Sequence, residues 1–470
     1  MMRATVLAIS GCVALAASAW AGAWAAPPNS AEAKAEAREI YAKAVGLDTS
    51  VEGKKTPELA VWLAARFKSA GFADADIHVI PMDETAALVV RLRGNGSGGK
   101  PILFLAHMDV VTAHRSDWTR DPFAFIEENG YFYGRGSYDN KSGLAELAAT
   151  FVQLKREGFT PKRDLVLVFS GDEETSGVTT KRLLAEHRDL IDGAFAMNSD
   201  AGGGALDETT GKPMAYALQT AEKTFASFTL TAHNPGGHSS QPRKENAIYD
   251  VVDALTKVRS YAFPVQWNAT TLASLKAMGA EDKSALGKAA LRFAAKPGDA
   301  AAAKTLTDSP FTVGQIRTTC VPTLLQGGHA DNALPQSAVA TVNCRIFPGV
   351  TIKTVQAKLQ KLAGAKITVG TLDEYVSSDA SPLRPDVLAA VKSAVEAIHP
   401  GTPVTPSMSA GATDGVFYRA AGIPTYGVGE VFIKDSDDFS HGLNERMPVA
   451  TFYAGLIYWD ALIRSIANAP

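Results

Sequence analysis

Cysteine, long apolar runs and clustered charge are all scarce in this 470-residue sequence. It has three cysteines, and 46 Lys and Arg against 49 Asp and Glu leave a formal net charge of −3 at pH 7. The basic residues form no stripe, which argues against a nucleic-acid partner. There is no acidic tail and no Gly-x-Ser-x-Gly motif, which argues against the serine hydrolases built on that turn. The length favours two domains, or three.

The apolar run that stands out lies in the first 25 residues. Arg3 gives a positive start, residues 6–19 are small and apolar, and the Ala-Trp-Ala segment ending at Ala25 fits a signal-peptidase site. We expect residues 1–25 to be a signal peptide, cleaved after Ala25, with export to a bacterial periplasm and no membrane attachment of the mature protein. A membrane anchor needs a longer span of about 20 apolar residues. Lipid attachment at Cys12 is disfavoured because apolar sequence continues beyond it.

Export changes what the two remaining cysteines imply. Cys320 and Cys344 lie on strand-like runs, residues 315–326 and 337–347, joined by a loop with Gly, Asn and Pro. If these runs pair as a hairpin centred near Asn332, the thiols lie opposite each other. An oxidising compartment then allows a cross-strand disulfide. Two buried free thiols are the alternative, and the sequence leaves both open.

Strand-like and helix-like runs alternate along most of the chain. Strands are expected at residues 86–92, 102–106, 164–170 and 193–198, and helices at residues 31–44, 56–69, 142–157, 353–362, 386–398 and 449–466. This alternation indicates an α/β catalytic domain with a mostly parallel central sheet. The pattern changes near residue 222, where strand, helical and again strand-like sequence follow one another. We expect an inserted α+β lid or dimerisation domain at residues 222–350, between catalytic segments 26–221 and 351–470.

Acidic and imidazole side chains collect where the expected strands end. One strand delivers a histidine, the next a cluster of acids and the third an aspartate, while a glycine-bearing turn adds another. Open α/β sheets bind ligands outside the carboxyl ends of their strands, so these groups face one crevice. Left unpaired, they would cost on the order of several kcal/mol in repulsion and desolvation. A divalent cation removes that cost, and a His–carboxylate set suits zinc. The residues are His107, Asp109, Asp139, Glu173, Glu174 and Asp200.

Eight short motifs resemble, in the same order, those of a known family. They are AHMDVV at Ala106, YGRGSYDNKSG at Tyr133, GDEE at Gly171, NSD at Asn198, GGHSSQP at Gly236, DNALPQSAVATVNCR at Asp331, SAGATDG at Ser409 and DFSHG at Asp438. The family is that of the di-zinc metallopeptidases, with acetylornithine deacetylase, succinyl-diaminopimelate desuccinylase, aminoacylase, and carboxypeptidase and dipeptidase relatives. The resemblance runs over most of the mature chain and implies a zinc-peptidase-like catalytic domain with an inserted second domain.

The resemblance implies two Zn²⁺ per subunit, which Co²⁺ or Mn²⁺ can replace. Asp139 would bridge the two ions. Glu174 and His441 would complete one site, and His107 and Asp200 the other. Two such ions share a water whose pKa falls toward about 7, which makes that water a nucleophile at neutral pH.

The resemblance also assigns the proton chemistry. Glu173, next to the ligand Glu174, would be the general base that takes a proton from water and passes it to the leaving nitrogen. Asp109, two residues after His107, would orient the imidazole through its distal nitrogen. Because the base and every ligand position are retained, a non-catalytic metal-holding binding protein is the weaker alternative.

Substrate contacts are implied from the second domain. His238 matches the family's oxyanion-stabilising histidine, which often acts across a dimer interface. Asn332 and Arg345 would hold the substrate, with the guanidinium fork clamping a carboxylate, and Gly411 would offer backbone contacts. Relatives dimerise through the inserted domain, but the long helical stretch 246–307 leaves a homodimer and a monomer with an enlarged lid both open.

The substrate is less closely defined than the chemistry. At the position of Asp200, the family has aspartate in aminopeptidases and dipeptidases and glutamate in carboxypeptidases and deacylases. The sequence around Arg345 instead resembles the carboxypeptidase and N-acyl-amino-acid branch. We therefore expect an exported di-zinc exopeptidase or dipeptidase acting on short peptides. An N-acyl-amino-acid amidohydrolase or a carboxypeptidase is the alternative.

Overall fold

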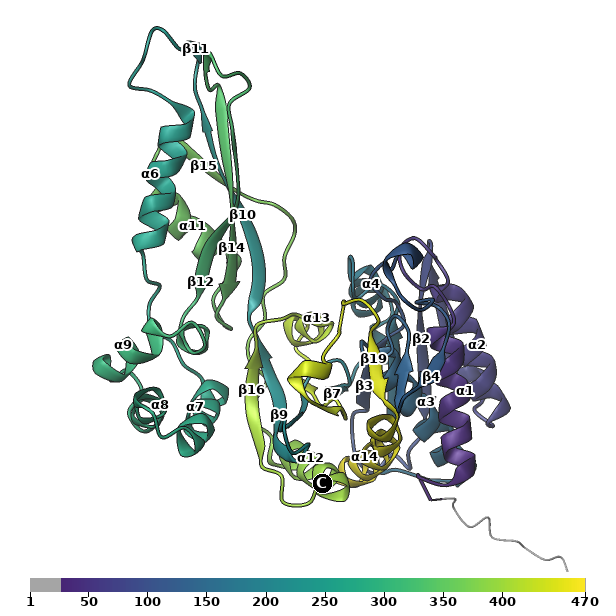
Figure 1. Ribbon diagram of the computed structural model, residues 1–470. Coiled ribbons are helices and arrows are strands. Elements are labelled where there is room, and N and C mark those ends of the chain that lie inside the picture. Colours follow the sequence, from purple (N-terminus) through teal and green to yellow (C-terminus); the bar gives the residue numbers. More distant parts are fainter. Residues whose placement is uncertain (1–26, 470) are drawn as a thin grey trace, which may run out of the picture.

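The computed structural model describes residues 27–469 and contains two layered domains joined by extended strands (Figure 1). The expected signal peptide, residues 1–25, lies outside the described residues. Within the described range, no helix is both long enough and apolar enough to cross a bilayer. The α/β class with a mostly parallel central sheet, predicted from the alternation of runs, is confirmed.

A ten-stranded mixed sheet forms the centre of the larger domain. Its strands are β1 (Ile77–Met82), β2 (Thr85–Leu92), β3 (Ile102–His107), β6 (Leu165–Ser170), β7 (Phe195–Asn198), β8 (Gly203–Leu206), β9 (Pro213–Glu222), β16 (Val404–Ser409), β17 (Thr425–Gly427) and β18 (Phe432–Ile433). Their order is β1-β2-β6-β3-β7-β17-β9-β8-β18, with β16 paired to β9. The middle strands β6, β3, β7 and β17 run parallel and are buried on both faces, which explains their nearly continuous apolar sequence.

Helices cover both faces of this sheet. One face carries α1 (Ala31–Val45), α2 (Thr56–Ser69), α3 (Lys141–Arg156), α12 (Pro385–Ile398) and α14 (Val449–Ala467), and the other carries α4 (Val178–Glu186), α5 (Arg188–Ile191) and α13 (Gly415–Ala420). A small sheet and three short turns complete the domain, namely β4 (Ile126–Glu128), β5 (Tyr131–Tyr133), β19 (Arg446–Pro448), η1 (Asp74–Asp76), η2 (Arg115–Asp117) and η3 (Asp435–Asp437). The larger domain is therefore a three-layer α/β/α unit.

A four-stranded antiparallel sheet with helices on one face forms the second domain. Its strands, in spatial order, are β12 (Thr319–Gly327), β14 (Ser337–Ile346), β10 (Thr224–His233) and β15 (Ile367–Thr371). α6 (Ala247–Ser260) and α11 (Ile352–Ala363) cover the buried positions of β10 and β14, which alternate with more exposed ones. The opposite face of the sheet is directed toward the larger domain (Figure 1).

One expected domain boundary, at residue 350, is wrong. The sequence pattern predicts that residues 351–371 belong to the catalytic domain, but α11 and β15 belong to the second one, because β15 pairs with β10 and the apolar side of α11 joins its core. A strand expected from residue 315 also starts later, at Thr319, because Val313–Ile316 forms the short helix α10. Local periodicity identifies a helix followed by a strand but not the sheet that they join.

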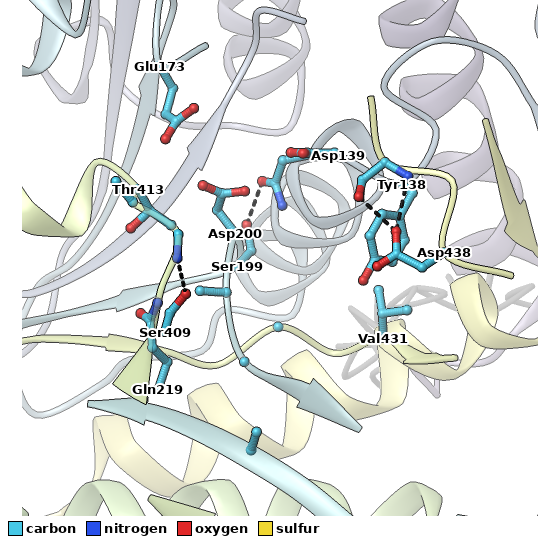
Figure 2. A pocket seen from close by; sticks show the side chains of 18 of the residues that line it. Tyr138, Asp139, Glu173, Ser199, Asp200, Gln219, Ser409, Thr413, Val431 and Asp438 are labelled. Atoms are coloured by element: carbon cyan, nitrogen blue, oxygen red, sulfur yellow. Dashed lines mark hydrogen bonds between the residues drawn. The ribbon is translucent and has the colours of Figure 1, made fainter. Parts of the chain in front are cut away.

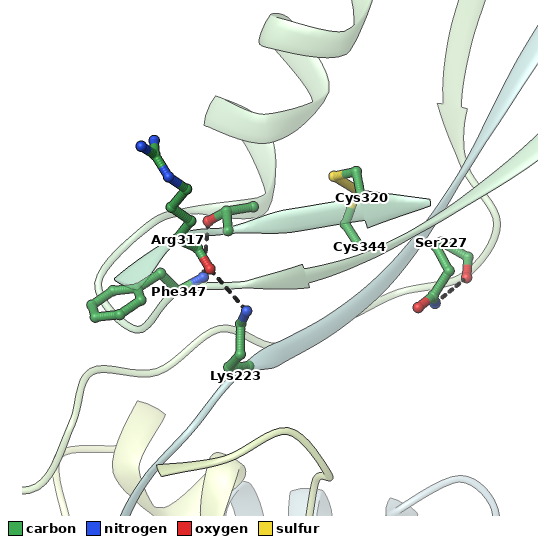
Figure 3. Close-up of a disulfide and its surroundings, with 8 residues drawn as sticks. Lys223, Ser227, Arg317, Cys320, Cys344 and Phe347 are labelled. Carbon is green, nitrogen blue, oxygen red and sulfur yellow. Dashed lines mark hydrogen bonds between the residues drawn. A yellow bond between two sulfur atoms is a disulfide. The ribbon is translucent and has the colours of Figure 1, made fainter. Parts of the chain in front are cut away.

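A helical insert reaches from the second domain back to the larger one. α7 (Ala269–Glu281), α8 (Ala285–Ala295), α9 (Ala300–Asp308) and α10 surround a small core of their own. α7 lies against β16, and the buried hydroxyl groups of Thr270 and Thr220 are hydrogen-bonded at 2.6 Å. Between β9 and β10, Lys223 Nζ donates to the Arg317 carbonyl at 2.9 Å (Figure 3). These contacts fix the orientation of the second domain on the first.

The two cysteines of the expected mature chain form a disulfide. Cys320 of β12 and Cys344 of β14 are directly opposite in the antiparallel register, and their sulfur atoms are bonded (Figure 3). Of the two options that the sequence leaves open, the structure has the cross-strand bridge. The bridge ties the edge strand β12 to the rest of its sheet.

Candidate metal centre

Parallel strands deliver the expected metal ligands to one edge of the central sheet. β3 ends at His107, which is paired in register with Ser170 at the end of β6. The chain after β6 carries Glu173 and Glu174, and the chain after β7 carries Asp200. Because β6, β3 and β7 are neighbouring parallel strands, their carboxyl ends meet at one crevice.

Asp139 faces two histidines with its two carboxylate oxygens. Its Oδ1 lies 3.0 Å from His107 Nε2, and its Oδ2 lies 3.2 Å from His441 Nε2. Asp200 Oδ1 is 3.5 Å from His107 Nε2, and Glu174 Oε1 is 3.0 Å from His441 Nε2. The five side chains therefore form two groups that share Asp139, each with its ligand atoms within 4.8 Å of one another. This is the grouping that the motif resemblance implies.

Asp109 contacts both His107 and the segment that carries the acids. His107 Nδ1 lies 3.0 Å from the Asp109 carbonyl oxygen and 3.5 Å from its carboxylate. The two carboxylate oxygens accept the backbone N–H groups of Glu173 at 3.1 Å and Glu174 at 3.0 Å. Asp109 thus orients the imidazole mainly through its carbonyl group. Its carboxylate holds the neighbouring acidic segment, a contact that the sequence did not predict.

The titration of these groups reflects an excess of buried negative charge. Burial raises the pKa of Asp200 to about 7. Burial and the charge of Asp200 raise the pKa of Glu173 well above its usual value. Burial acts to lower the pKa of His107, but Asp200, Asp109 and Asp139 together raise it. Imidazole and carboxylate groups crowded in this way are the donor set that Zn²⁺ prefers, so the residues fit a two-metal site.

A cleft of about 650 Å³ opens over these groups. The acidic side chains point into its middle (Figure 2). Ser409 and Thr413 line one side, and Val431 and Asp438 line the other. Gly411 also lines the cleft. A cleft of this size suits a small molecule.

Arg345 of the second domain lies at the Gly411 side. Its Nη1 donates to the Ala410 carbonyl at 2.5 Å, and its guanidinium group lies over the Phe225 ring at 4.8 Å. Burial lowers its pKa, and no acidic side chain among the described residues pairs with it. Arg345 and Gly411 are therefore placed together, with a guanidinium group available for an anion.

His238 and Asn332 lie elsewhere. β11 (Gly237–His238) and β13 (Ala333–Leu334) pair at the distal tip of the second domain (Figure 1). His238 is exposed there, and the Asn332 carbonyl accepts the Ser239 N–H at 3.0 Å. Neither residue lines the cleft of its own chain.

Several residues that line the cleft were given no role from the sequence, among them Tyr138, Val431 and Asp438. Tyr138 precedes Asp139, and Asp438 lies three residues before His441, so proximity to a ligand could have identified both. Val431 is far from any ligand in sequence. It reaches the cleft only because the chain between β17 and β18 passes along it.

A metal-dependent amide hydrolase is the class of protein that this fold and this cleft define. Residues 103–465 match the peptidase family M20/M25/M40, and the chain belongs to that family. The match confirms the family resemblance carried by the motifs and the prediction of a metallopeptidase-type enzyme.

Individual relatives cover most of the chain. It is 27% identical over 387 residues to the N-fatty-acyl-amino acid synthase/hydrolase PM20D1 of Homo sapiens. The aligned region covers 80% of this chain and 76% of that protein. It is 25% identical over 416 residues to aminoacylase-1 of Mus musculus, spanning 87% and 90%. The M20 family metallo-carboxypeptidase Sso-CP2 of Sulfolobus solfataricus has the same fold, with a TM-score of 0.68 over 92% of this chain and 99% of that chain at 18% identity.

Proposed function

We propose that this protein is an exported two-zinc hydrolase that releases amino acids from N-acyl-amino acids. The observation that carries the proposal is the layout of the cleft. His107 and His441 face the two oxygens of Asp139, which lines the cleft. Arg345, without an acidic partner among the described residues, donates to the Ala410 carbonyl next to the lining residue Gly411. Two relatives that are named for acyl-amino acid chemistry support this substrate class.

In the proposed reaction the chain holds the metals and moves the proton. The residues that would hold two Zn²⁺ are His107, Asp139, Glu174, Asp200 and His441. Bound zinc lowers the pKa of a water and polarises a carbonyl group. Glu173, whose backbone is held by Asp109, accepts a proton from the attacking water and donates it to the leaving nitrogen.

Arg345 sets the direction in which the substrate lies. With its α-carboxylate at Arg345 and Gly411, the substrate extends across the metal ligands, and its acyl group reaches the other side of the cleft. Tyr138 and Val431 line that part of the cleft, with Asp438 beside them. The Tyr138 ring and the Val431 side chain suit an acyl chain, whereas a peptide ammonium group would depend on Asp438 as its partner.

A dipeptidase is the second candidate, and Asp438 favours it. Apart from the metal ligands, Glu173 and the buried Glu430, Asp438 is the one carboxylate among the described residues that lines the cleft. Its Oδ1 accepts the Ser440 N–H at 3.1 Å and the Ser440 hydroxyl at 2.7 Å. The α-ammonium group of a dipeptide could pair with Asp438 at the cleft mouth.

A matched substrate panel separates the two candidates. N-acetyl-, N-hexanoyl- and N-dodecanoyl-amino acids are compared with dipeptides of the same carboxyl-terminal residue, on zinc-loaded wild type and on Asp438→Asn. We expect faster hydrolysis of the N-acyl series, loss with a chelator, recovery with Zn²⁺ or Co²⁺, and no change in Asp438→Asn. Faster dipeptide cleavage that Asp438→Asn selectively loses would support the dipeptidase. Failure of metal-loaded protein on both series would contradict both.

The proposed enzyme works as a homodimer joined through the second domain. β12 is the edge strand of its sheet, and Val321 and Leu324 on it are 56% and 61% exposed. α6, beside β12, exposes Tyr249 and Val252. A free strand edge with apolar side chains around it suits pairing with a second copy. Such a copy is also needed if His238 at the domain tip is to reach a cleft.

Export to the periplasm belongs to the same proposal. The expected cleavage site follows Ala25, and the Cys320–Cys344 disulfide suits an oxidising compartment. Protein recovered from the periplasmic fraction of an expressing bacterium should begin at Ala26 by amino-terminal sequencing. An uncleaved chain confined to the cytoplasm would contradict the assignment.

A further inference from the structure

A buried carboxylate near the metal ligands has no part in the chemistry described so far. Glu445 is fully buried, and each of its oxygens accepts two hydrogen bonds. Oε1 accepts the backbone N–H groups of Tyr138 at 2.8 Å and Asp139 at 3.0 Å. Oε2 accepts the Gly136 N–H at 3.1 Å and Arg135 Nη1 at 2.6 Å. One side chain thus organises the whole turn that presents Asp139.

Arg135 connects the same carboxylate to His441. Its Nη1 binds Glu445, and its Nη2 donates to the His441 carbonyl at 3.3 Å. The guanidinium group is buried. The backbone carbonyl of Glu445 also accepts the Gly134 N–H at 3.1 Å. The turn that carries Asp139 and the loop that carries His441 therefore form one hydrogen-bonded unit.

We propose that Glu445 is a positioning residue that sets Asp139 and His441 at the separation that a bound metal ion requires. The inference rests on the proposed two-zinc site. Asp139 faces His107 and His441 with different oxygens, at 3.0 and 3.2 Å, so a rotation of its backbone would disturb both contacts. The hydrogen bonds from the Tyr138 and Asp139 N–H groups to one carboxylate oppose that rotation.

The position calls for a carboxylate rather than a residue of similar size. All four partners of Glu445 are donors, and an ionised carboxyl group accepts through both oxygens. A glutamine amide nitrogen would face two of these donors without an acceptor to offer. Glu445→Gln therefore removes two hydrogen bonds at nearly constant volume.

Glu445→Gln should weaken the binding of one zinc ion more than that of the other. His107 is the last residue of β3 and Asp200 lies shortly after β7, and the pairing of these two central strands holds both ligands in place. Asp139 and His441 depend on the unit built around Glu445. Removing a residue that supports metal ligands typically weakens metal binding about 10–100-fold. In Glu445→Gln we expect a weakening of this size for one ion, so that zinc content falls from two toward one.

Glu222 provides a matched control. It is also a buried glutamate bound to a buried arginine, since it accepts from Arg419 and, at 2.6 Å, from the Thr413 hydroxyl. Neither partner is an expected metal ligand. Glu222→Gln should lower the melting temperature of the metal-free protein about as much as Glu445→Gln does, but should leave both zinc affinities unchanged.

The test is equilibrium dialysis of each metal-free variant against buffered zinc, with metal analysis, the Co²⁺ absorption spectrum and thermal unfolding as readouts. Arg135→Lys keeps a positive charge beside Glu445 but loses the second donor, so a smaller weakening is expected; it replaces Glu445→Gln if that variant fails to fold. Unchanged zinc affinity in both Glu445→Gln and Arg135→Lys would overturn the proposal. A loss of zinc affinity in Glu222→Gln equal to that in Glu445→Gln would also overturn it. A wild type that binds fewer than two ions would instead refute the two-zinc site, and the inference with it.

Discussion

Glu146 and Glu430 are two buried carboxyl groups, and Glu430 also lines the cleft. Glu146 is fully buried in α3, and Glu430 accepts the Trp459 Nε1–H at 3.0 Å. Burial raises the pKa of Glu146 well above its usual value, with the charge of Glu430 adding to the effect, and burial raises the pKa of Glu430 to about 7. No basic side chain among the described residues contributes to either pKa. Near neutral pH the folded protein therefore holds protons that the unfolded chain releases.

This pair predicts that stability falls as the pH rises. A carboxyl group whose folded pKa exceeds its unfolded pKa binds more protons in the native state, so the contribution of Glu430 to the free energy of unfolding decreases from about pH 4.5 through about pH 7. Glu146, whose pKa is also raised well above its usual value, adds a decrease in the same direction. For Glu430 the decrease is on the order of 3 kcal/mol. Denaturant unfolding between about pH 5 and pH 9 should show a smaller decrease in Glu430→Gln than in wild type. Equal decreases in the two proteins would contradict this account.

Glu173→Gln is expected to leave a folded, zinc-loaded protein with little activity. Glutamine cannot take a proton from water, and a general base typically contributes about 10²–10⁴-fold, so kcat should fall about 10³-fold. The backbone N–H of Glu173 is bound to Asp109 at 3.1 Å whatever the side chain, so the ligand Glu174 stays in place. Metal analysis alongside kcat is the check. A full zinc load with unchanged kcat would remove Glu173 from the mechanism.

Residues were predictable where the role follows from local sequence. His107 ends a buried strand, and Glu174 comes shortly after the neighbouring one, so their convergence follows from a parallel sheet. Glu445 was not predictable, because the Tyr138 N–H that it binds lies 307 residues earlier. Motif matching places His238 among substrate contacts, but only the fold shows that its own cleft is out of reach.

The Cys320–Cys344 bridge reinforces an exposed element. Within the described sheet, β12 pairs on one side with β14, and most of its side chains are exposed. The bridge joins residues 24 positions apart. A cross-link over a loop of this length restricts the unfolded chain by about 3 kcal/mol.

Replacing both cysteines with serine should therefore destabilise the second domain by about 3 kcal/mol without changing zinc content. Thermal unfolding of the double variant is compared with that of wild type, each with and without reductant. Reduced wild type should unfold like the double variant, whereas reductant should not affect the variant. A wild type that is indifferent to reductant would show that the bridge contributes nothing.

Helices and strands were predictable from the sequence where they are long enough to show a hydrophobic period. The helix expected at residues 142–157 is α3 (Lys141–Arg156), and the central strands appear within a few residues of their expected bounds. α11 and β15 were assigned to the wrong domain, because a helix followed by a strand fits a parallel layer and an antiparallel sheet equally well. The pairing of β15 with β10 determines the domain to which α11 and β15 belong, and this pairing joins segments far apart in sequence. The four-residue helix α10 is too short to show a helical period.

At the scale of the whole molecule, the helical insert holds the tip of the second domain away from the cleft of the same chain. A buried contact between Thr220 and Thr270 joins the two domains, and Lys223, at the junction of β9 and β10, donates to the Arg317 carbonyl. The tip that carries β11 and β13 extends away from the larger domain (Figure 1). A hinge motion that brought His238 over its own metal ligands would have to break these contacts and leave buried polar groups unpaired. In the proposed homodimer, His238 would instead serve the cleft of the second copy.

Mixing two inactive variants tests this arrangement. His238→Ala lacks the proposed oxyanion donor and Glu173→Gln lacks the base, so neither homodimer should be active. In a mixed dimer, one cleft combines an intact Glu173 with His238 of the partner subunit, and the other carries both substitutions. Random pairing of equal amounts makes half of the dimers mixed, so coexpression should restore about a quarter of wild-type activity.

The control pairs His238→Ala with a chain that carries both substitutions, because that combination leaves no cleft complete. If His238 served the cleft of its own chain, no mixed dimer would contain a complete site, and coexpression would restore nothing. Glu173→Gln should still bind two zinc ions in that case, since its ligands are untouched. A failure of complementation would therefore count against the shared site and leave the metal centre and its chemistry as they stand.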